Sequence, residues 1–343
     1  MVPEGIDDPT RPSGGNTYDR RICDGLAALG WTVYEHAVRD ASALAAAVAR
    51  IPDGAVVLLD GLIASPAPEA LVPHAHRLRQ VVLMHMPFGD DDERAVLEAA
   101  TAVVTTSEWT RRRLGDLYDL PADRVHVAQP GVDAAALAPG SAAGDALLCV
   151  AAVTPGKGHD VLIDGLAMAA DLSWHCTCVG SLDRDPVFAS SVRRRARDNG
   201  LGDRVRFPGP RTGPELDRAY VDADLLVLAS YAETYGMVIT EALARGLPVI
   251  AADVGGVTEA LGCGDDGTRP GLLVPPGDPA ALRAALRSWL GDAELRERLR
   301  QAARERRASL RGWPATTAVL GRVLAEAASD DRAEAGGLAE VTR

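Results

Sequence analysis

Residues 230–256 read SYAETYGMVITEALARGLPVIAADVGG, and this stretch decides the fold of the chain. One short apolar run, LLVL at 225–228, comes just before it, and another, VIAA at 249–252, lies near its end. Between the two runs, Gly236 precedes a segment of good helix formers that Pro248 ends. This order predicts a strand, helix, strand unit, and hence an α/β fold with parallel strands.

Two carboxylates, Glu233 and Glu241, flank Gly236 in this unit. Their spacing alone is weak evidence of a site, because the chain has 48 Asp and Glu residues. Their position is stronger evidence, because α/β folds bind ligands at the carboxyl ends of parallel strands. A helix that begins at Gly236 would also offer unpaired backbone N–H groups to an anion.

The motifs around these carboxylates resemble those of a known family. Ser230 and Glu233 form S-x-x-E, Glu241 opens E-A-x-x-x-G-x-P, and G-G-x-x-E ends at Glu259. The pattern resembles the Glu-x7-Glu signature of the retaining glycosyltransferases of family 4. The resemblance spans nearly the whole chain, with its specific motifs in residues 145–275. It implies a GT-B fold, an α/β architecture of two Rossmann-like domains with a cleft between them and a C-terminal helix crossing back to the N-terminal domain.

The composition limits the class of protein. The 343 residues are 47% hydrophobic and 24% charged, which is typical of a soluble globular chain long enough for two domains. No apolar run approaches 18 residues and the N-terminus lacks signal-peptide features, so we expect a cytoplasmic protein. The net charge of -12 argues against general nucleic-acid binding, and the five cysteines show no CxxC pair or metal-ligand spacing. A small-molecule enzyme is therefore the default interpretation.

Lys157 is the only lysine among 36 Lys and Arg residues. It lies in TPGKGHD, which is not a P-loop because Ala151 and Gly158 stand where that motif needs Gly and Ser or Thr. A glycine-flanked lysine at a helix N-terminus can instead hold phosphate. The alternative is that the single lysine of this chain occurs here by chance. The family commonly has an arginine before this lysine, and its position falls on Ala152. Arg211 or an arginine of the N-terminal domain is expected to supply the positive charge that is missing at Ala152.

In the N-terminal half, short apolar runs alternate with helical or loop stretches, which predicts a parallel sheet covered by helices. The predicted strands are residues 31–34, 55–59, 81–84, 102–105 and 125–128. The resembling family has a full first strand, whereas only residues 1–3 precede the first loop here. Either this strand is a stub or the true start lies upstream.

The loop that follows contains Gly14 and Gly15, and in the family it faces the donor phosphates and the acceptor. Asn16 and Thr17 are expected to cap a helix that runs to Gly30. A plain connection is the alternative interpretation of the Gly-Gly turn.

His85 directly follows the apolar run 81–84. A histidine there could simply pack, but the family places a cleft histidine after the corresponding strand, where it contacts the transferred sugar. The three aspartates at 90–92 suggest a metal site at first sight. The start of a helix over ERAVLEAA explains them better, because acidic residues are favoured at helix N-termini.

We expect three parts along the chain. Residues 1–142 form an N-terminal, acceptor-side Rossmann-like domain, which residues of about 312–328 complete. Residues 143–311 form the C-terminal domain that binds the nucleotide sugar, with two helices in 278–308. Residues 329–343 are polar and small, which predicts a flexible tail.

The resemblance implies a role for each matching residue. Glu233 would bind hydroxyls of the donor sugar, Glu241 the ribose diol, and Lys157 the diphosphate, together with backbone N–H groups. The candidate catalytic residues are Lys157, Glu233 and His85. The candidate donor-binding residues are Gly14, Gly15, Lys157, Arg211, Glu233, Tyr235, Gly236, Met237, Val238 and Glu241. No metal ligand and no cofactor are expected beyond the nucleotide-sugar donor itself.

The predicted function is thus retaining, metal-independent transfer of a sugar, with a UDP-sugar as the first choice of donor. We expect a soluble small-molecule acceptor, no nucleic-acid partner and at most peripheral membrane contact. A sugar-nucleotide epimerase, a non-catalytic nucleotide-sugar binder and a membrane glycolipid mannosyltransferase-like enzyme are the alternatives on the same fold. A two-carboxylate glycosidase is disfavoured, because it leaves Lys157 without a purpose.

Overall fold

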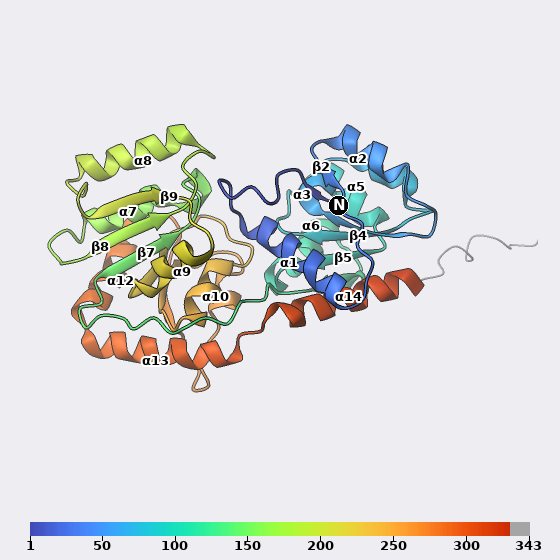
Figure 1. Ribbon diagram of the computed structural model, residues 1–343. Coiled ribbons are helices and arrows are strands. Elements are labelled where there is room, and N and C mark those ends of the chain that lie inside the picture. The colour runs from blue at the N-terminus through green and yellow to red at the C-terminus, as the bar shows by residue number, and fades with distance from the viewer. Residues whose placement is uncertain (330–343) are drawn as a thin grey trace, which may run out of the picture. The chain divides into compact units, whose positions relative to one another are not determined.

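The computed structural model describes residues 1–329, which divide into two compact units. Unit 1 comprises Met1–Ile6, Asp19–Gln129 and the described residues from Pro314 onward. Unit 2 comprises Asp7–Tyr18 and Pro130–Trp313. Each unit contains a parallel β-sheet with helices packed against it, as the sequence predicts (Figure 1). The tail predicted to be flexible lies outside the described residues, apart from the serine at 329.

Unit 1 has a four-stranded parallel sheet in the order β3-β4-β5-β6, and a separate parallel pair, β1 and β2. The strands are β1 (Val2–Pro3), β2 (Ala37–Val38), β3 (Val56–Asp60), β4 (Arg79–Met84), β5 (Ala102–Thr105) and β6 (Val125–Val127). The helices are α1 (Gly14–Ala28, shared with unit 2), α2 (Ala41–Val48), α3 (Gly61–Ala64), α4 (Pro68–Leu71), η1 (Val72–His74), α5 (Asp91–Ala99), α6 (Glu108–Tyr118), η2 (Ala122–Arg124) and α14 (Trp313–Ser329).

Unit 2 has a six-stranded parallel sheet in the order β12-β11-β10-β7-β8-β9. The strands are β7 (Ala146–Val150), β8 (His175–Val179), β9 (Val205–Gly209), β10 (Leu225–Leu228), β11 (Val249–Ala252) and β12 (Gly271–Val274). The helices are η3 (Pro155–Lys157), α7 (His159–Ala167), α8 (Pro186–Asp198), α9 (Gly213–Val221), α10 (Met237–Ala244), α11 (Val257–Leu261), α12 (Pro279–Gly291) and α13 (Ala293–Ser309).

The buried strand β10 shows why unit 2 forms three layers. Leu225 and Val227 join one apolar cluster with α7, α8 and α12, whereas Leu226 and Leu228 join another with α9, α10 and α11. Alternate residues of a strand point to opposite faces, so an uninterrupted apolar run is buried on both sides. Each fully buried leucine contributes roughly 1.5–3 kcal/mol.

Aspartate side chains begin several of the helices. Asp90 accepts a hydrogen bond from the backbone N of Glu93, which confirms that the acidic run marks the start of α5. Asp278 and Asp292 cap α12 and α13 in the same way, at the two-helix segment predicted near the C-terminus. Each such cap is worth about 1 kcal/mol.

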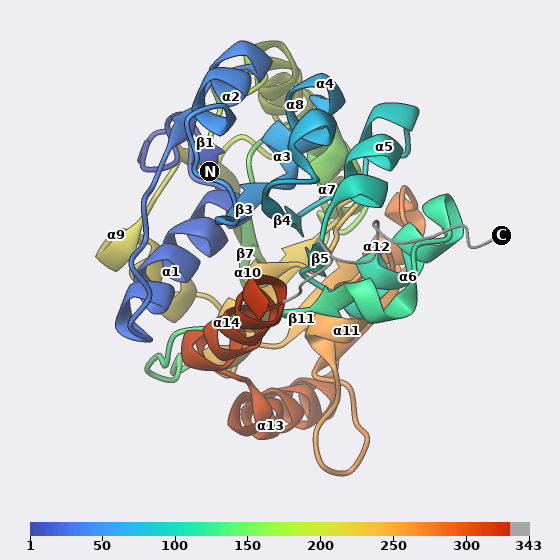
Figure 2. The same ribbon diagram turned by 90° about the vertical axis from the view of Figure 1, so that its right-hand side faces the viewer.

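The C-terminal helix α14 packs in unit 1, as predicted. Thr316 donates a hydrogen bond through its hydroxyl to the carbonyl of Gln129 at 2.8 Å. Where α14 meets α1, a Cβ on Gly25 would lie 2.3 Å from Oγ1 of Thr317, so only glycine permits this approach. These two helices lie on one side of the strands of unit 1, and α5 and α6 lie on the other (Figure 2).

Two local predictions in the N-terminal region are wrong. Residues 31–34 form no strand, and strand β2 instead covers only Ala37–Val38, where the chain pairs with β1. Helix α1 starts at Gly14 rather than after Thr17, because the hydroxyl of Ser13 accepts from the backbone N of Asn16 at 3.1 Å and takes the capping role.

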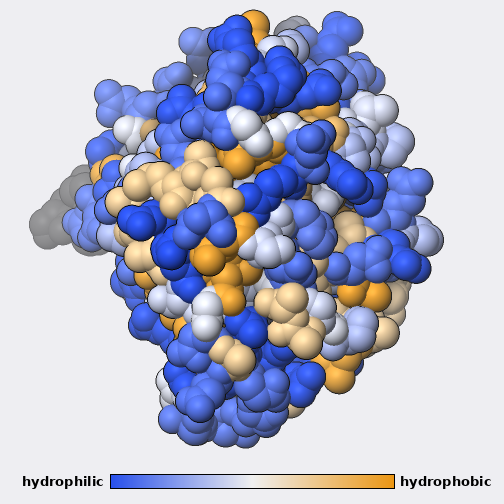
Figure 3. Space-filling view, turned by 90° about the vertical axis from the view of Figure 1, so that its left-hand side faces the viewer, coloured by the Kyte–Doolittle hydropathy of each residue, from blue (hydrophilic) through white to orange (hydrophobic). Residues whose placement is uncertain are grey.

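The surface is mostly hydrophilic, with apolar residues in small groups on the face that Figure 3 shows. Within residues 1–329, none of the helices combines the length and the apolar character needed to span a bilayer.

Candidate functional site

The two key charged residues of unit 2 meet at the carboxyl ends of β7 and β10. These strands are neighbours in the sheet, so the loops that follow them lie side by side. The Nζ of Lys157, at the end of η3, donates to Oε1 of Glu233 at 2.6 Å. The hydroxyl of Ser230 donates to the same oxygen at 2.9 Å. The Lys157 side chain is 33% exposed and that of Glu233 only 11%, so a ligand would reach the ammonium more easily than the carboxylate.

Two backbone contacts hold the loop that carries Lys157. The backbone N of Tyr231 donates to the carbonyl of Gly156 at 2.9 Å. Gly158 has a φ of 63°, and a Cβ there would lie 1.9 Å from the carbonyl oxygen of Ala229. A side chain at this position would meet both a strained backbone and a clash with another backbone. The tight turn at Gly158 therefore fixes where the side chain of Lys157 starts.

The Gly-Gly pair of the G-G-x-x-E motif holds the loop of Glu233. Gly256 donates its backbone N–H to the carbonyl of Glu233 at 2.9 Å, and its own Cβ would lie 2.3 Å from the carbonyl oxygen of Thr234. Gly255 has a φ of 56°, and a Cβ there would lie 1.7 Å from the carbonyl oxygen of Glu233. The motif thus positions the carboxylate through backbone packing, which explains why glycine is needed twice.

Helix α10 begins beside this pair. Gly236 precedes it with a φ of 95°, and Met237 is its first residue. The first N–H groups of a helix have no partner within it and carry partial positive charge, so this end suits an anion. Gly14, the first residue of α1, lies close by, because a Cβ on it would be 3.3 Å from Sδ of Met237. The structure therefore brings together Gly14 and the start of α10.

Tyr235, the predicted donor-binding residue before Gly236, points into the protein, and Val238 is partly buried. The side chain of Tyr235 is 6% exposed, and burial raises the pKa of its phenol to about 12. Val238 packs against the same apolar cluster. Any contact of Tyr235 with a ligand would therefore involve its backbone atoms.

Glu241 is held by a side chain that sequence motifs do not reveal. The hydroxyl of Tyr220, on α9, donates to Oε2 of Glu241 at 2.7 Å. The guanidinium of Arg245 lies 4.6 Å from the centre of the Tyr220 ring. Burial raises the pKa of Glu241, and the tyrosine hydrogen bond and the arginine charge oppose this shift. Oε1 of Glu241 makes no hydrogen bond with any residue in the described part of the chain and is left to accept from a ligand.

The remaining unit 2 candidates lie at loop positions. Arg211 is half-buried between β9 and α9, at the carboxyl end of its strand. Gly15 lies in the first turn of α1, in the segment that belongs to unit 2 up to Tyr18.

His85 lies in unit 1, at the carboxyl end of β4, in a buried cluster of charged groups. Its Nε2 is 2.7 Å from Oδ1 of Asp19 and 3.9 Å from Oδ2 of Asp60. Burial disfavours the imidazolium, but the Asp19 hydrogen bond and the two carboxylate charges outweigh it, so the pKa of His85 is raised. Burial, followed by the charge of Asp19, raises the pKa of Asp60 to about 7. One nitrogen or oxygen atom of each of the three side chains lies within 4.8 Å of the corresponding atoms of the other two.

Sequence reasoning did not identify Tyr220, Asp19 or Asp60. Asp19 lies one helical turn after Gly15, and the position of Asp60 at the end of an apolar run was the only signal for it. Tyr220 gives no signal in the sequence, because it reaches Glu241 only when α9 and α10 pack on the same face of the sheet.

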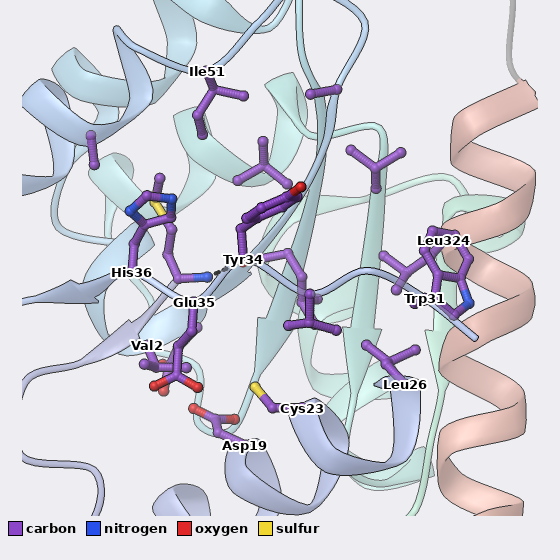
Figure 4. Close-up of a pocket in the computed structure, with 18 of the residues that line it drawn as sticks. Val2, Asp19, Cys23, Leu26, Trp31, Tyr34, Glu35, His36, Ile51 and Leu324 are labelled. Carbon is purple, nitrogen blue, oxygen red and sulfur yellow. Dashed lines mark hydrogen bonds between the residues drawn. The ribbon is translucent and has the colours of Figure 1, made fainter. Parts of the chain in front are cut away.

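A cavity of about 700 Å³ lies within unit 1 (Figure 4). Its wall is largely apolar and includes Trp31 and Leu324, while the carboxylates of Asp19 and Glu35 lie near each other at one end. All its lining residues belong to unit 1. The cavity is therefore separate from the charged site that surrounds Lys157.

Comparison with known proteins agrees with this geometry. Residues 143–306 match the family described as glycosyl transferases group 1. The chain is 35% identical over 297 residues to a D-inositol 3-phosphate glycosyltransferase of Kineococcus radiotolerans, covering 78% of this chain and 68% of that protein. It is 34% identical over 232 residues to the enzyme of the same name from Jonesia denitrificans, covering 62% of this chain but only 54% of that one. The match thus spans between about half and two thirds of these relatives.

A solved structure has the same fold. The Anabaena protein HepE, crystallised in complex with UDP and glucose, superimposes with a TM-score of 0.73 at 17% identity, over 95% of this chain and 98% of that one. HepE is a GT-B protein, and the two parallel α/β units described above have this architecture. The predicted fold is therefore confirmed. The chain belongs to the group 1 glycosyltransferases of family 4.

Proposed function

We propose that the protein is a retaining glycosyltransferase that moves a sugar from a nucleoside-diphosphate sugar to a small soluble acceptor. A UDP-sugar is the first choice of donor. The observation that carries this proposal is the contact between Lys157 and Glu233 beside the start of α10. A cation, a carboxylate and free helix N–H groups at one place match a phosphate flanked by sugar hydroxyls. The presence of UDP in the HepE crystal supports the choice of donor.

Each side chain has one task in the proposed donor complex. Glu233 accepts hydrogen bonds from hydroxyls of the transferred sugar, and the free Oε1 of Glu241 accepts from the ribose diol. Lys157 and the backbone N–H groups of Gly236 and Met237 hold the diphosphate. Ser230 and Tyr220 orient the two carboxylates through the hydrogen bonds already made in the structure.

The proposed reaction breaks the bond between the anomeric carbon and the diphosphate oxygen and forms a bond from the same carbon to an acceptor oxygen. The acceptor approaches on the face from which the diphosphate leaves, so the configuration is retained. The departing phosphate oxygen takes the proton of the acceptor hydroxyl, and the products are the glycoside and the nucleoside diphosphate. Lys157 and the helix N–H groups stabilise the negative charge that grows on the phosphate, which lowers the barrier.

The other predicted residues complete the proposal. Gly14 and Gly15, in the first turn of α1, approach the donor closely, Arg211 contacts the base or a phosphate, and Tyr235 and Val238 contribute further contacts. His85 contacts the transferred sugar, with Asp19 holding its ring. In this proposal, the basic groups and helix ends hold the diphosphate, and no metal ion or other cofactor takes part.

The acceptor is proposed to be a small hydroxylated molecule. The acidic balance of the chain disfavours an anionic membrane surface, and its named relatives act on D-inositol 3-phosphate. We therefore also propose a cytoplasmic location, at most peripheral membrane contact and no nucleic-acid partner.

The test is mass spectrometry of products from UDP- and GDP-sugars combined with polyol and polyol-phosphate acceptors, followed by NMR of the anomeric proton. We expect a new glycoside, an equivalent amount of nucleoside diphosphate and the anomeric configuration of the donor. A change in the sugar without an acceptor would identify an epimerase instead. Thermal stabilisation by the donor without any product would identify a binding protein.

The membrane alternative has its own assay. In co-sedimentation with vesicles of phosphatidylglycerol and phosphatidylcholine, most of the protein should stay in the supernatant. A protein found mainly in the pellet would favour a lipid acceptor.

A further inference from the structure

Arg184 is a cation of unit 2 that has no assigned task. It lies between β8 and α8, and its side chain is exposed. Its Nη2 donates to the carbonyl oxygens of Arg11 at 3.1 Å and of Pro12 at 3.5 Å. Nε and Nη1 make no hydrogen bond with any residue from 1 to 329. Two carbonyl groups thus orient the guanidinium and leave the rest of its planar fork for another acceptor.

A second guanidinium, that of Arg11, lies near Arg184. Partial burial and the nearby charge of Arg11 both lower the pKa of Arg184. Within the described part of the chain, neither arginine forms an ion pair with a carboxylate. Two neighbouring guanidinium groups repel each other, and one of them loses hydration, so an anion placed between them would be stabilised.

The loop of Arg184 packs against the position where the family's arginine is missing. Strands β7 and β8 are neighbours, and the backbone N of Val153 donates to the carbonyl of Ser181 at 2.9 Å. A Cβ on Gly180 would lie 1.9 Å from the carbonyl oxygen of Ala151 and 2.9 Å from the backbone N of Ala152. The arginine expected on the loop after β7 is replaced by Ala152, and the adjacent loop after β8 carries Arg184 instead.

One short segment joins Arg184 to the start of α10. Arg11 accepts the hydrogen bond from Arg184, and Gly14 approaches the side chain of Met237. Three peptide units separate Arg11 from Gly14, so their Cα atoms are at most about 11 Å apart. The segment 11–14 therefore connects the residue that Arg184 contacts with the residue that lies beside Met237.

We propose that Arg184 binds a phosphate group of the ligand and takes the place of the arginine that is missing at Ala152. This inference rests on the proposed function. The diphosphate of the donor is the first source of that phosphate, because Lys157 lies on the loop after β7, the strand next to β8. A phosphorylated acceptor is the second source. In both cases Nε and Nη1 donate to phosphate oxygens while Nη2 keeps its carbonyl partners.

Calorimetric binding of UDP and uridine tests the first source. We expect Arg184→Ala to weaken UDP binding at least tenfold and to change uridine binding less than twofold. Arg184→Lys should fall between wild type and the alanine variant, because it keeps the charge but loses the fork. Arg193→Ala is the matched control, since this arginine of α8 is exposed and makes no ion pair within residues 1–329. It should bind UDP within twofold of wild type.

D-myo-inositol 3-phosphate and myo-inositol test the second source in the presence of UDP. A loss of affinity for the phosphorylated compound alone, with UDP binding unchanged, would assign Arg184 to the acceptor phosphate. Unchanged binding of both UDP and inositol phosphate by Arg184→Ala would overturn the inference. Circular dichroism of each variant excludes unfolding as the cause of a loss.

A rescue experiment tests the replacement itself. Adding Ala152→Arg to the Arg184→Ala protein should restore at least half of the lost UDP affinity on a logarithmic scale, and no restoration would contradict the replacement. Lys157→Ala distinguishes a failure of this inference from a failure of the proposed function. If it abolishes UDP binding while Arg184→Ala does not affect any ligand, the inference fails and the proposed function stands. If wild type binds no nucleoside diphosphate, both fail.

Discussion

The ammonium of Lys157 lies 2.6 Å from Oε1 of Glu233, and this ion pair connects the loops after β7 and β10. The two residues are 76 positions apart in the chain. They meet because β7 and β10 are neighbours in a sheet whose strand order departs from the chain order. The hydrogen bond from Ser230 fixes the carboxylate, so the lysine is held at the mouth of the sheet before any ligand binds.

Removing the ammonium should affect turnover more than any other change of charge. We expect Lys157→Ala to lower kcat/KM by at least about 100-fold, the size of effect seen when one preorganised donor is lost. Lys157→Arg should recover little of this, because the larger guanidinium starts from a tightly packed turn. Steady-state kinetics with the identified donor provide the measurement. Arg193→Ala should stay within about twofold of wild type, and near-normal activity of Lys157→Ala would remove this residue from the mechanism.

The two glycines beside Lys157 should differ sharply in how much an alanine substitution destabilises the protein. Gly158→Ala should lower the free energy of unfolding by about 3 kcal/mol or more, because φ is 63° and the new Cβ would meet a carbonyl oxygen at 1.9 Å. Gly156→Ala should change it by no more than about 1 kcal/mol, since nothing lies within 4 Å of a Cβ there. Urea unfolding of the two variants checks this pair. Equal stability would contradict the tight turn.

Glu241 should discriminate the ribose of the nucleotide. Wild type should bind UDP about tenfold more tightly than 2′-deoxy-UDP, which corresponds to about 1.4 kcal/mol for the lost hydrogen bonds. Glu241→Ala should bind both nucleotides equally. Tyr220→Phe should keep part of the preference, because it removes only the hydroxyl that donates to Oε2. Calorimetry provides the four affinities, and an unchanged preference in Glu241→Ala would exclude the ribose contact.

Asp60 should make stability depend on pH. The folded state raises the pKa of Asp60 from 3.8 to about 7, so the folded form holds this proton more tightly than the unfolded form. The contribution of this Asp60 proton to the free energy of unfolding is complete below pH 3.8 and is lost as the pH rises toward 7. The full effect is at most about 4 kcal/mol. Asp60→Asn cannot titrate, so we expect its free energy of unfolding to fall less than that of wild type between pH 4 and pH 7.

Urea unfolding at several pH values measures this difference. Asp116→Asn, an exposed change on α6, is the control and should follow the wild-type pH profile. Parallel profiles of wild type and Asp60→Asn would show that the Asp60 proton is not held more tightly in the folded state.

Most of the secondary structure follows from local chemistry. The uninterrupted apolar runs at 225–228 and 249–252 became buried strands, because strands covered on both faces need no polar residues. The acidic run at 90–92 became a helix start because carboxylates accept from free N–H groups. The strand predicted at 31–34 failed, because a strand needs a partner to pair with and β1 pairs only at Ala37 and Val38.

The sequence by itself determined the class of fold, the family and the identity of the candidate residues around Lys157 and Glu233. Its motifs are local, and glycine, proline and carboxylate positions within them carry their own physical meaning. Only the tertiary structure decided that Lys157 touches Glu233, that Tyr220 holds Glu241, and that the loop of Arg184 begins beside Ala152. The reason is that these contacts depend on strand order and on how loops pack, and neither leaves a periodic or local signal along the chain.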